Sequence, residues 1–168
     1  MQVANDTVVP SPLAQLGEIV RGGTVEVGCD TICLHLLQDL GERAPTGPEG
    51  RLLLQVVSNG YTAGARTHTL TLAECPAVHD AIVHDRVIAV EDAVTDPRVA
   101  RKAIESFKIR ACVYAPLRVH GDGVGVVIPS FGRRHGWTEP QIAAVRRVAS
   151  MASEALEKAY ARRLGVTG

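Results

Sequence analysis

The residues with the clearest chemical potential are Cys75 and His79, in the passage A-E-C-P-A-V-H-D-A. Pro76 suits the first turn of a helix, so Cys75 would be the N-cap residue, and a spacing of four residues places both side chains on one helix face. The helix dipole and the unpaired N–H groups at a helix N-terminus lower the pKa of a thiol. The pair could therefore sense redox state, activate a thiolate, or bind a metal or haem. The alternative, favoured because no third ligand is evident, is that both residues only pack.

The other cysteines indicate packing more than chemistry. Cys112 lies within an apolar β-rich run and is expected in the core. Cys29 and Cys33 form a C-x-x-x-C pattern. At the start of a strand their side chains would lie about 13 Å apart, too far to share a metal, so we expect no metal site there. Four cysteines in a chain of 168 residues do not suggest a disulfide scaffold, which favours reduced thiols in an intracellular protein.

Several charged residues in the central stretch could face a ligand. Asp92 follows a buried strand and suits a turn, and Asp96 is expected to cap a helix with Pro97 at its first position. Arg98, Arg101 and Arg110, within or just after that helix, could meet an anionic ligand at the edge of a pocket. The alternative is that these arginines are solvated, as arginines on a helix face usually are.

The composition narrows the class of protein. The formal net charge is zero, so the chain has no electrostatic footprint for nucleic acid or for a membrane surface. No apolar run approaches the length of roughly 18 residues that a membrane-spanning helix needs. The N-terminal residues lack the basic and apolar regions of a signal peptide, which favours a cytoplasmic location.

Hydrophobic periodicity and turn residues predict a single domain over residues 12–163, with a lead-in at 1–11, a surface loop at 41–50 and a tail at 164–168. In chain order, the expected elements are a helix (12–27), three strands (31–38, 51–58 and 66–72), a short helix from Pro76, a strand (87–90), a helix ending near Lys108, two strands (111–117 and 123–128) and a helix to about 163.

Two local motifs in the C-terminal half are especially clear. His120-Gly121-Asp122 suits a tight hairpin between the last two strands. Thr138 and Gln141 form a capping box at the start of the last helix, and Trp137 and Ile142 are placed as the hydrophobic staple around it. Together these elements indicate an α+β fold with a six-stranded, mostly antiparallel sheet.

The chain resembles a GAF domain over roughly residues 13–161. The resemblance rests on four features in order: V-I-A-V-E-D-A-V-T-D-P-R-V, the strand ending A-C-V-Y-A-P-L, the following G-V-G-V-V-I, and the helix start W-T-E-P-Q-I. It implies a six-stranded antiparallel sheet with the N- and C-terminal helices on one face and a ligand pocket on the other, roofed by residues 75–108. GAF domains commonly sense small molecules or dimerise within signalling proteins. The passage at 73–81 is similar to the pocket-side helix of GAF domains in bacterial transcription regulators.

Departures from better-understood GAF subfamilies disfavour particular ligands. The Asn-Lys…Phe…Asp-Glu signature of cyclic-nucleotide-binding members is missing, although Lys108 follows Phe107. The helix at 100–107 contains no cysteine for covalent bilin attachment. Free methionine-R-sulfoxide reductases, which are GAF-like enzymes, carry their active cysteine well upstream of a Val-Pro-Leu-like segment, whereas Cys112 lies only four residues before Pro116. The resemblance therefore leaves the ligand unidentified.

Three hypotheses for function follow. The preferred one is a non-enzymatic sensory or regulatory domain that binds a small molecule and signals through its terminal helices. The second is a thiol-redox enzyme using Cys75 with Cys112 or His79, and the third is an interaction module without a pocket, which the low aromatic content of 4% favours mildly. For the first hypothesis, the residues expected to line the pocket are Cys75, His79, Asp92, Arg98, Phe107, Arg110, Cys112 and Tyr114.

The expected partner is a second copy of the chain. The apolar stripe of Leu13–Val20 and the small-residue face of Thr138–Arg163 could pack within one chain or across a homodimer. Direct nucleic-acid binding and membrane binding are not expected.

Overall fold

A computed structural model describes residues 10–38, 52–59 and 70–163. A six-stranded sheet forms its centre, with every neighbouring pair antiparallel and the strand order β3-β2-β1-β6-β5-β4. The strands, from one edge to the other, are β3 (Leu70–Thr71), β2 (Leu52–Asn59), β1 (Thr31–Leu37), β6 (Asp122–Phe131), β5 (Ala111–Val119) and β4 (Ile88–Val90).

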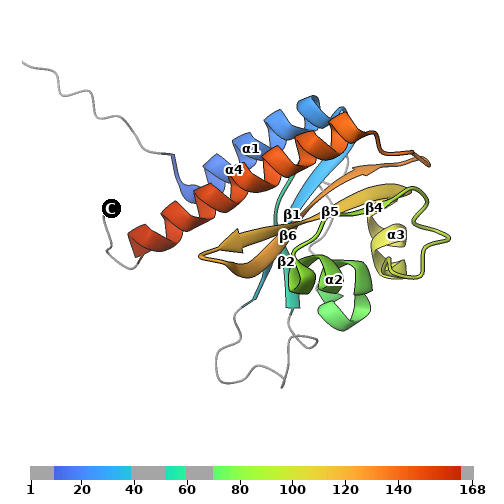
Figure 1. The fold of residues 1–168 in the computed structure, drawn as a ribbon, viewed down its shortest axis with the longest axis horizontal. Coiled ribbons are helices and arrows are strands. Elements are labelled where there is room, and N and C mark those ends of the chain that lie inside the picture. Colours follow the sequence, from blue (N-terminus) through green and yellow to red (C-terminus); the bar gives the residue numbers. More distant parts are fainter. Residues whose placement is uncertain (1–9, 39–51, 60–69, 164–168) are drawn as a thin grey trace, which may run out of the picture.

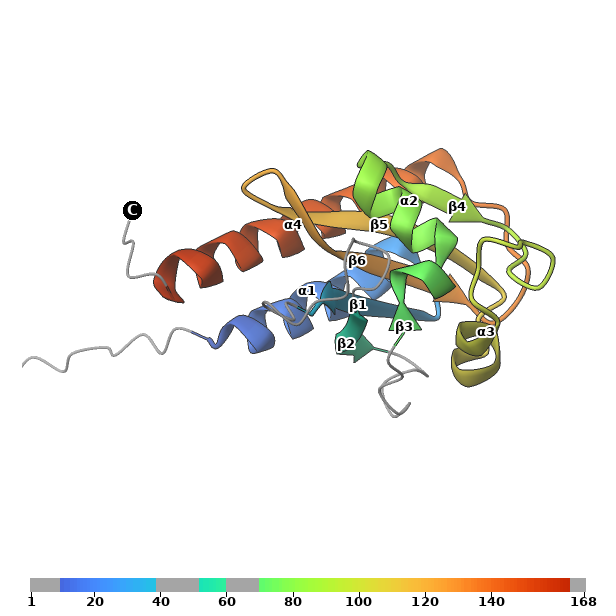
Figure 2. The same ribbon diagram turned by 90° about the horizontal axis from the view of Figure 1, so that it is seen from below.

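Helices cover both faces of this sheet. The long helices α1 (Pro12–Val27) and α4 (Glu139–Arg163) lie side by side on one face (Figure 1). The shorter α2 (Pro76–His84) and α3 (Arg101–Phe107) lie on the other, together with the 3₁₀ turn η3 (Leu72–Glu74). Figure 2, viewed from the side of the short helices, shows α2 crossing the sheet and α3 farther along. The predicted α+β class and the two-sided arrangement are confirmed.

The bounds of α1 follow from local signals at both ends. Ser11 is the N-cap, and its Oγ accepts a hydrogen bond from the N–H of Ala14, while Pro12 occupies a position where a missing N–H costs nothing. The helix ends at Gly28, which has a φ of +73°, a left-handed conformation that glycine adopts without strain. The predicted range 12–27 is confirmed.

The start of α4 carries the predicted capping box. The N–H of Gln141 donates to Oγ1 of Thr138 at 3.3 Å, and the N–H of Thr138 donates to Oε1 of Gln141 at 3.1 Å. Trp137 and Ile142, on either side of the cap, are both half-buried against the core. The helix therefore begins at a position fixed by its own first residues.

The sheet divides the core into two clusters. One lies under α1 and α4, and its centre is made of aliphatic side chains such as Val20, Leu34 and Val148. The other lies between the sheet and the short helices and contains Tyr114, Phe107 and other residues of the roof. Because strand side chains alternate between faces, β5 contributes Val113 to the first cluster and Tyr114 to the second.

The predicted helix after Pro97 begins later than expected. Oδ1 of Asp96 accepts the N–H of Arg98 at 2.9 Å, so this carboxylate closes a turn, and α3 starts only at Arg101 with Ala100 as its N-cap. The N–H of Val99 donates to the carbonyl of Asp96 at 3.2 Å within this turn, and the buried Ala100 is extended, so the helix begins only after it. The predicted end near Lys108 is confirmed, because Lys108 is the left-handed C-cap.

The remaining elements differ from expectation by small amounts. Of the predicted strand 66–72, only Leu70–Thr71 falls in a described strand, and residues 66–69 lie outside the described residues. The predicted lead-in up to residue 9, the loop 41–50 and the tail also lie outside them. His120 and Gly121 have positive φ in the predicted β5–β6 hairpin. Among the described helices none is both long and apolar enough to cross a membrane.

Candidate ligand-binding cavity

An enclosed cavity lies between the sheet and the short helices, where the family resemblance implies a pocket. Its volume is about 30 Å³, which is small compared with the roughly 300–1,000 Å³ of typical ligand pockets. Most of its wall is apolar, and the apolar lining residues are Val78 on α2, Ala100, Ala103 and Phe107 on or beside α3, and Ile109 and Ile128. The polar part of the wall consists of Cys33, His35, Cys75 and Tyr114.

His35 is the most unusual group in this wall. It lies on β1, opposite Val126 of β6 and Gln55 of β2, and only 5% of its surface is exposed. Its Nδ1 has no hydrogen-bond partner among the residues that the structure describes. Burial lowers the pKa of the imidazole from 6.5 to about 4, so the ring is neutral at pH 7. A buried polar atom without a partner costs roughly 1–3 kcal/mol, which makes it a candidate contact for a ligand.

Cys75 and Cys112, the two thiols considered for redox chemistry, are not activated. Cys75 is the N-cap of α2, as predicted, but its side chain makes no capping hydrogen bond and is buried. Burial, helped by the charge of Glu74, raises the pKa of Cys75 to about 12. Burial likewise raises the pKa of Cys112 to about 12. The prediction of a lowered Cys75 pKa is therefore wrong, because loss of hydration outweighs the helix dipole at this N-terminus.

Tyr114 connects the cavity wall to the buried Cys112. The two side chains share a hydrogen bond across one face of β5, and burial raises the pKa of the Tyr114 hydroxyl well above its ordinary value. Cys112 does not line the cavity, although it belongs to the same buried cluster. Both residues are therefore neutral at pH 7.

Of the eight residues predicted to line a pocket, the structure brings Cys75, Phe107 and Tyr114 to the cavity wall. His79 is half-buried on α2 and does not line it. The three charged candidates lie away from the wall: Arg98 pairs with Asp96 at 2.6 Å, and Arg110 pairs with Asp92 at 2.6 Å.

The Asp92–Arg110 pair instead links the roof to the loop before α4. The Arg110 hydrogen bonds hold the pKa of Asp92 below its ordinary value, and Arg134 lies 3.3 Å from the same carboxylate. Nearby, Nε1 of Trp137 donates to the carbonyl of Val90 at 3.1 Å. The strand β4, the roof loop and the start of α4 are therefore tied together at one end of the sheet.

The link continues into the terminal helices through Gln141. Its Oε1 lies 2.8 Å from Nε2 of His135, and its Nε2 donates to the carbonyl of Val27, the last residue of α1, at 3.2 Å. The His135 N–H in turn donates to the carbonyl of Glu91, next to Asp92. A chain of contacts thus joins the roof loop to the ends of both α1 and α4.

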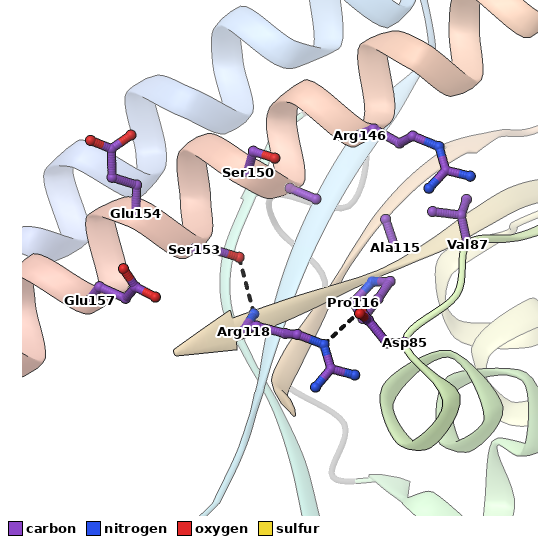
Figure 3. A pocket seen from close by; sticks show the side chains of 11 residues that line it. Asp85, Val87, Ala115, Pro116, Arg118, Arg146, Ser150, Ser153, Glu154 and Glu157 are labelled. Atoms are coloured by element: carbon purple, nitrogen blue, oxygen red, sulfur yellow. Dashed lines mark hydrogen bonds and ion pairs between the residues drawn. The ribbon is translucent and has the colours of Figure 1, made fainter. Parts of the chain in front are cut away.

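A second, open hollow lies beside α4 and has a volume of about 490 Å³ (Figure 3). Arg118 lines this hollow, but its side chain already interacts with other residues of the protein. It pairs with Asp85 at 2.6 Å and donates to the carbonyls of Gly121 and Ile82, while its backbone N–H donates to Oγ of Ser153. These contacts tie β5 to α4 and to the end of α2, so we interpret the role of Arg118 in the hollow as structural.

Comparison with known proteins identifies the family. The GAF domain model matches residues 15–156. The chain belongs to the GAF domain family. None of the curated proteins compared with it matches significantly.

Solved structures of GAF domains share this fold over nearly the whole chain. The PixJ GAF domain of Thermosynechococcus elongatus, in its blue-light absorbing form, has a TM-score of 0.71 at 17% identity, covering 92% of this chain and 90% of that one. The GAF domain of an Acinetobacter phosphoenolpyruvate-protein phosphotransferase has a TM-score of 0.68 at 17% identity, covering 92% and 87%. An enzyme also matches: free methionine-R-sulfoxide reductase of Neisseria meningitidis, with its substrate, has a TM-score of 0.69 at 15% identity, covering 90% and 81%.

Sequence reasoning missed the part of the cavity wall that β1 supplies. Cys33 and His35 were assigned to an ordinary core strand, and the pocket was sought only between residues 75 and 114. The available signal was alternation in T-I-C-L-H-L-L, which places Thr31, Cys33 and His35 on one face of the strand. A histidine in that row faces the opposite side from Ile32 and Leu34, toward the roof.

Proposed function

We propose that this GAF domain is a non-enzymatic sensory module that binds a small molecule in the cavity beneath α2 and α3. The observation that carries the proposal is the buried, unpartnered Nδ1 of His35 in a cavity wall that is otherwise apolar. A few convergent polar groups in an apolar enclosure are typical of small-molecule sites. The neighbouring GAF structures of photoreceptors support a sensory role.

The state of the thiols favours binding over catalysis. A thiol enzyme needs a thiolate, and Cys75 and Cys112 are buried with a pKa raised to about 12. His79, the base considered for Cys75, lies outside the cavity wall.

Binding would reach the terminal helices through the roof loop. Arg110 directly follows Ile109 of the cavity wall and holds Asp92, which also meets Arg134 of the loop before α4. Gln141 then joins the start of α4 to the end of α1. A ligand that favours one position of the roof would shift the population of one arrangement of these helix ends.

The output surface is the outer face of α1 and α4, which we propose forms a homodimer. Leu13 is 58% exposed and Met151 is 50% exposed, and a groove beside them has apolar walls that include Ile19 and Ala155. An M151E variant would be monomeric by sedimentation where the parent chain is dimeric, and an equally exposed change away from these helices, V94E, would leave the dimer intact.

The setting we infer is the bacterial cytoplasm, within a signalling or transcription-regulatory system. The four cysteines are all free, in keeping with a reducing compartment. The domain would act on transcription through a partner or a linked output domain, without contacting nucleic acid itself.

Native mass spectrometry of freshly purified protein tests the proposal. We expect a bound small molecule in the native spectrum, lost on denaturation, or binding of a member of a metabolite library to the apo protein. Ala103→Leu would fill the cavity and abolish this binding, whereas Ala143→Leu, on the exposed face of α4, would leave it unchanged. A chain that binds no member of the library would refute the sensory role.

The alternative function is reduction of free methionine-R-sulfoxide, which the fold shared with the Neisseria enzyme favours. An assay with that substrate and a thiol reductant distinguishes the two. We expect no turnover above that of a C75S/C112S double variant. Turnover that depends on these cysteines, with a reducible disulfide between them, would make the protein an enzyme.

A further inference from the structure

Among the residues that the structure describes, none with a charged side chain lines the cavity. Its lining includes no Asp, Glu, Lys or Arg among the described residues, and its polar members are two thiols, one imidazole and one phenol. Burial keeps the imidazole of His35 and the hydroxyl of Tyr114 neutral at pH 7. A charged ligand would therefore lose its hydration without gaining a counter-ion, a cost of several kcal/mol.

The two arginines considered as partners of an anionic ligand are already paired elsewhere. Arg98 is held by both carboxylate oxygens of Asp96, and Arg110 by both oxygens of Asp92. Neither arginine lines the cavity. An anion beneath the roof would have to break one of these bidentate pairs to bind either arginine.

His35 offers one directed polar contact in this uncharged wall. Its neighbours around the cavity include Ile128 and Val78, which present only apolar surface, while the hydroxyl of Tyr114 is engaged with Cys112. Among the described residues Nδ1 of His35 has no partner, so it is a polar atom that a ligand can satisfy without breaking an existing bond.

We propose that the cavity selects an uncharged, largely apolar molecule with a single hydrogen-bonding group, and that Nδ1 of His35 is the partner of that group. This inference rests on the proposed sensory function and names the chemical class of its ligand. An anionic metabolite, the ligand that Arg98 and Arg110 would have suited, is thereby disfavoured.

The roof must move to admit such a molecule, because a cavity of about 30 Å³ is far smaller than the roughly 300–1,000 Å³ of typical ligand pockets. Neither Cys75 of α2 nor Ala100 of α3 makes a side-chain capping hydrogen bond, although the N–H of Ala77 in α2 donates to the carbonyl of Arg98 at 3.0 Å. A missing N-cap bond weakens a helix start by roughly 1 kcal/mol, and α3 has only seven residues. Displacement of α3 would carry Ala103 and Phe107 away from the sheet and enlarge the space above His35.

The test uses four probes of similar shape with the full chain at pH 7.5: benzyl alcohol, benzoate, benzylamine and toluene. NMR titration follows the His35 imidazole and the Ile128 methyl groups, so that binding is localised to the cavity. We expect saturable binding of benzyl alcohol, and at least tenfold weaker binding of benzoate and benzylamine. Loss of the hydrogen bond in H35L should weaken benzyl alcohol about tenfold relative to toluene.

Two further variants keep the test independent of folding defects. H35Q retains a hydrogen-bonding side chain and should restore part of the preference for benzyl alcohol over toluene. H79L removes a histidine outside the cavity and should leave the preference unchanged.

Each outcome bears on one of the two proposals. Tighter cavity binding of benzoate or benzylamine, or an unchanged alcohol-to-toluene ratio in H35L, would overturn the ligand class while leaving a functioning pocket. Failure of all four probes would also overturn it. The sensory function itself is decided separately by the metabolite library, in which a charged ligand would sustain the function and refute the class.

Discussion

Replacing His35 with leucine should change how the stability of the domain depends on pH. Burial lowers the pKa of His35 to about 4 in the folded protein, from 6.5. Between these values the unfolded chain binds a proton at this residue and the folded chain does not, so stability falls as the pH falls. The loss is about 1.4 kcal/mol per pH unit, or about 3 kcal/mol over the whole interval. H35L lacks this loss.

Urea denaturation of both proteins between pH 7.5 and pH 4 measures the effect. At pH 7.5, H35L should be at least as stable as the parent, because the change removes a buried polar atom with no partner. As the pH is lowered, its free energy of unfolding should rise relative to that of the parent by about 3 kcal/mol. Carboxylates such as Asp92 and Asp96, whose pKa values are lowered by their arginine partners, also cost stability in acid, but equally in both proteins.

Parallel pH profiles for the two proteins would refute the reasoning, since they would mean that His35 is charged or hydrated in the folded state. H79L is the control, because it removes a half-buried histidine of α2 that lies outside the cavity. A difference profile for H79L matching that of H35L would also count against a special role of burial at His35.

Three further changes test other parts of the structure. Gly125→Ala should destabilise the domain by about 1–3 kcal/mol in thermal or urea unfolding, because an added Cβ would collide with the backbone carbonyl of His35 on the paired strand. Gln141→Ala should cost about 1 kcal/mol, since it removes half of the capping box and the bond to Val27, while Ala143→Gly on the same helix tests propensity alone. Cys75 should react with Ellman's reagent at pH 8 at least a hundredfold more slowly in the folded than in the urea-unfolded chain. The reason is that only roughly 1 in 10⁴ of a thiol with a pKa near 12 is ionised at that pH. Comparable rates would mean that the roof leaves the Cys75 thiol exposed.

The elements that sequence reasoning placed correctly are those governed by neighbouring residues. Ser11 and Pro12 fix the start of α1, and Thr138 with Gln141 fixes the start of α4, so tertiary contacts need not be known. The start of α3 was misplaced because Asp96, a good cap by type, accepts the N–H of Arg98 in a turn that ends at Val99, and only after the extended Ala100 does the helix begin.

The site was harder to predict because its chemistry depends on burial. Nothing near Cys75 in the sequence reveals that packing raises its pKa where a helix N-terminus alone would lower it. Asp92 pairs with Arg110, which lies eighteen residues further along the chain. This pair keeps away from the cavity two charged residues that the sequence suggested as ligand contacts. His35 was overlooked because a histidine in an apolar strand suggests no chemistry until its partners are known.

The same burial explains why Cys75 and Cys112 are not thiolates and why the cavity wall presents a neutral imidazole. Removing water from this face of the sheet suppresses the thiolates of Cys75 and Cys112, and with them the nucleophiles on which redox chemistry would depend. It also leaves the imidazole of His35 neutral, with a polar atom that packing alone does not satisfy. A leucine at that position would serve the core better, so a histidine there is better explained by a bound molecule than by the fold.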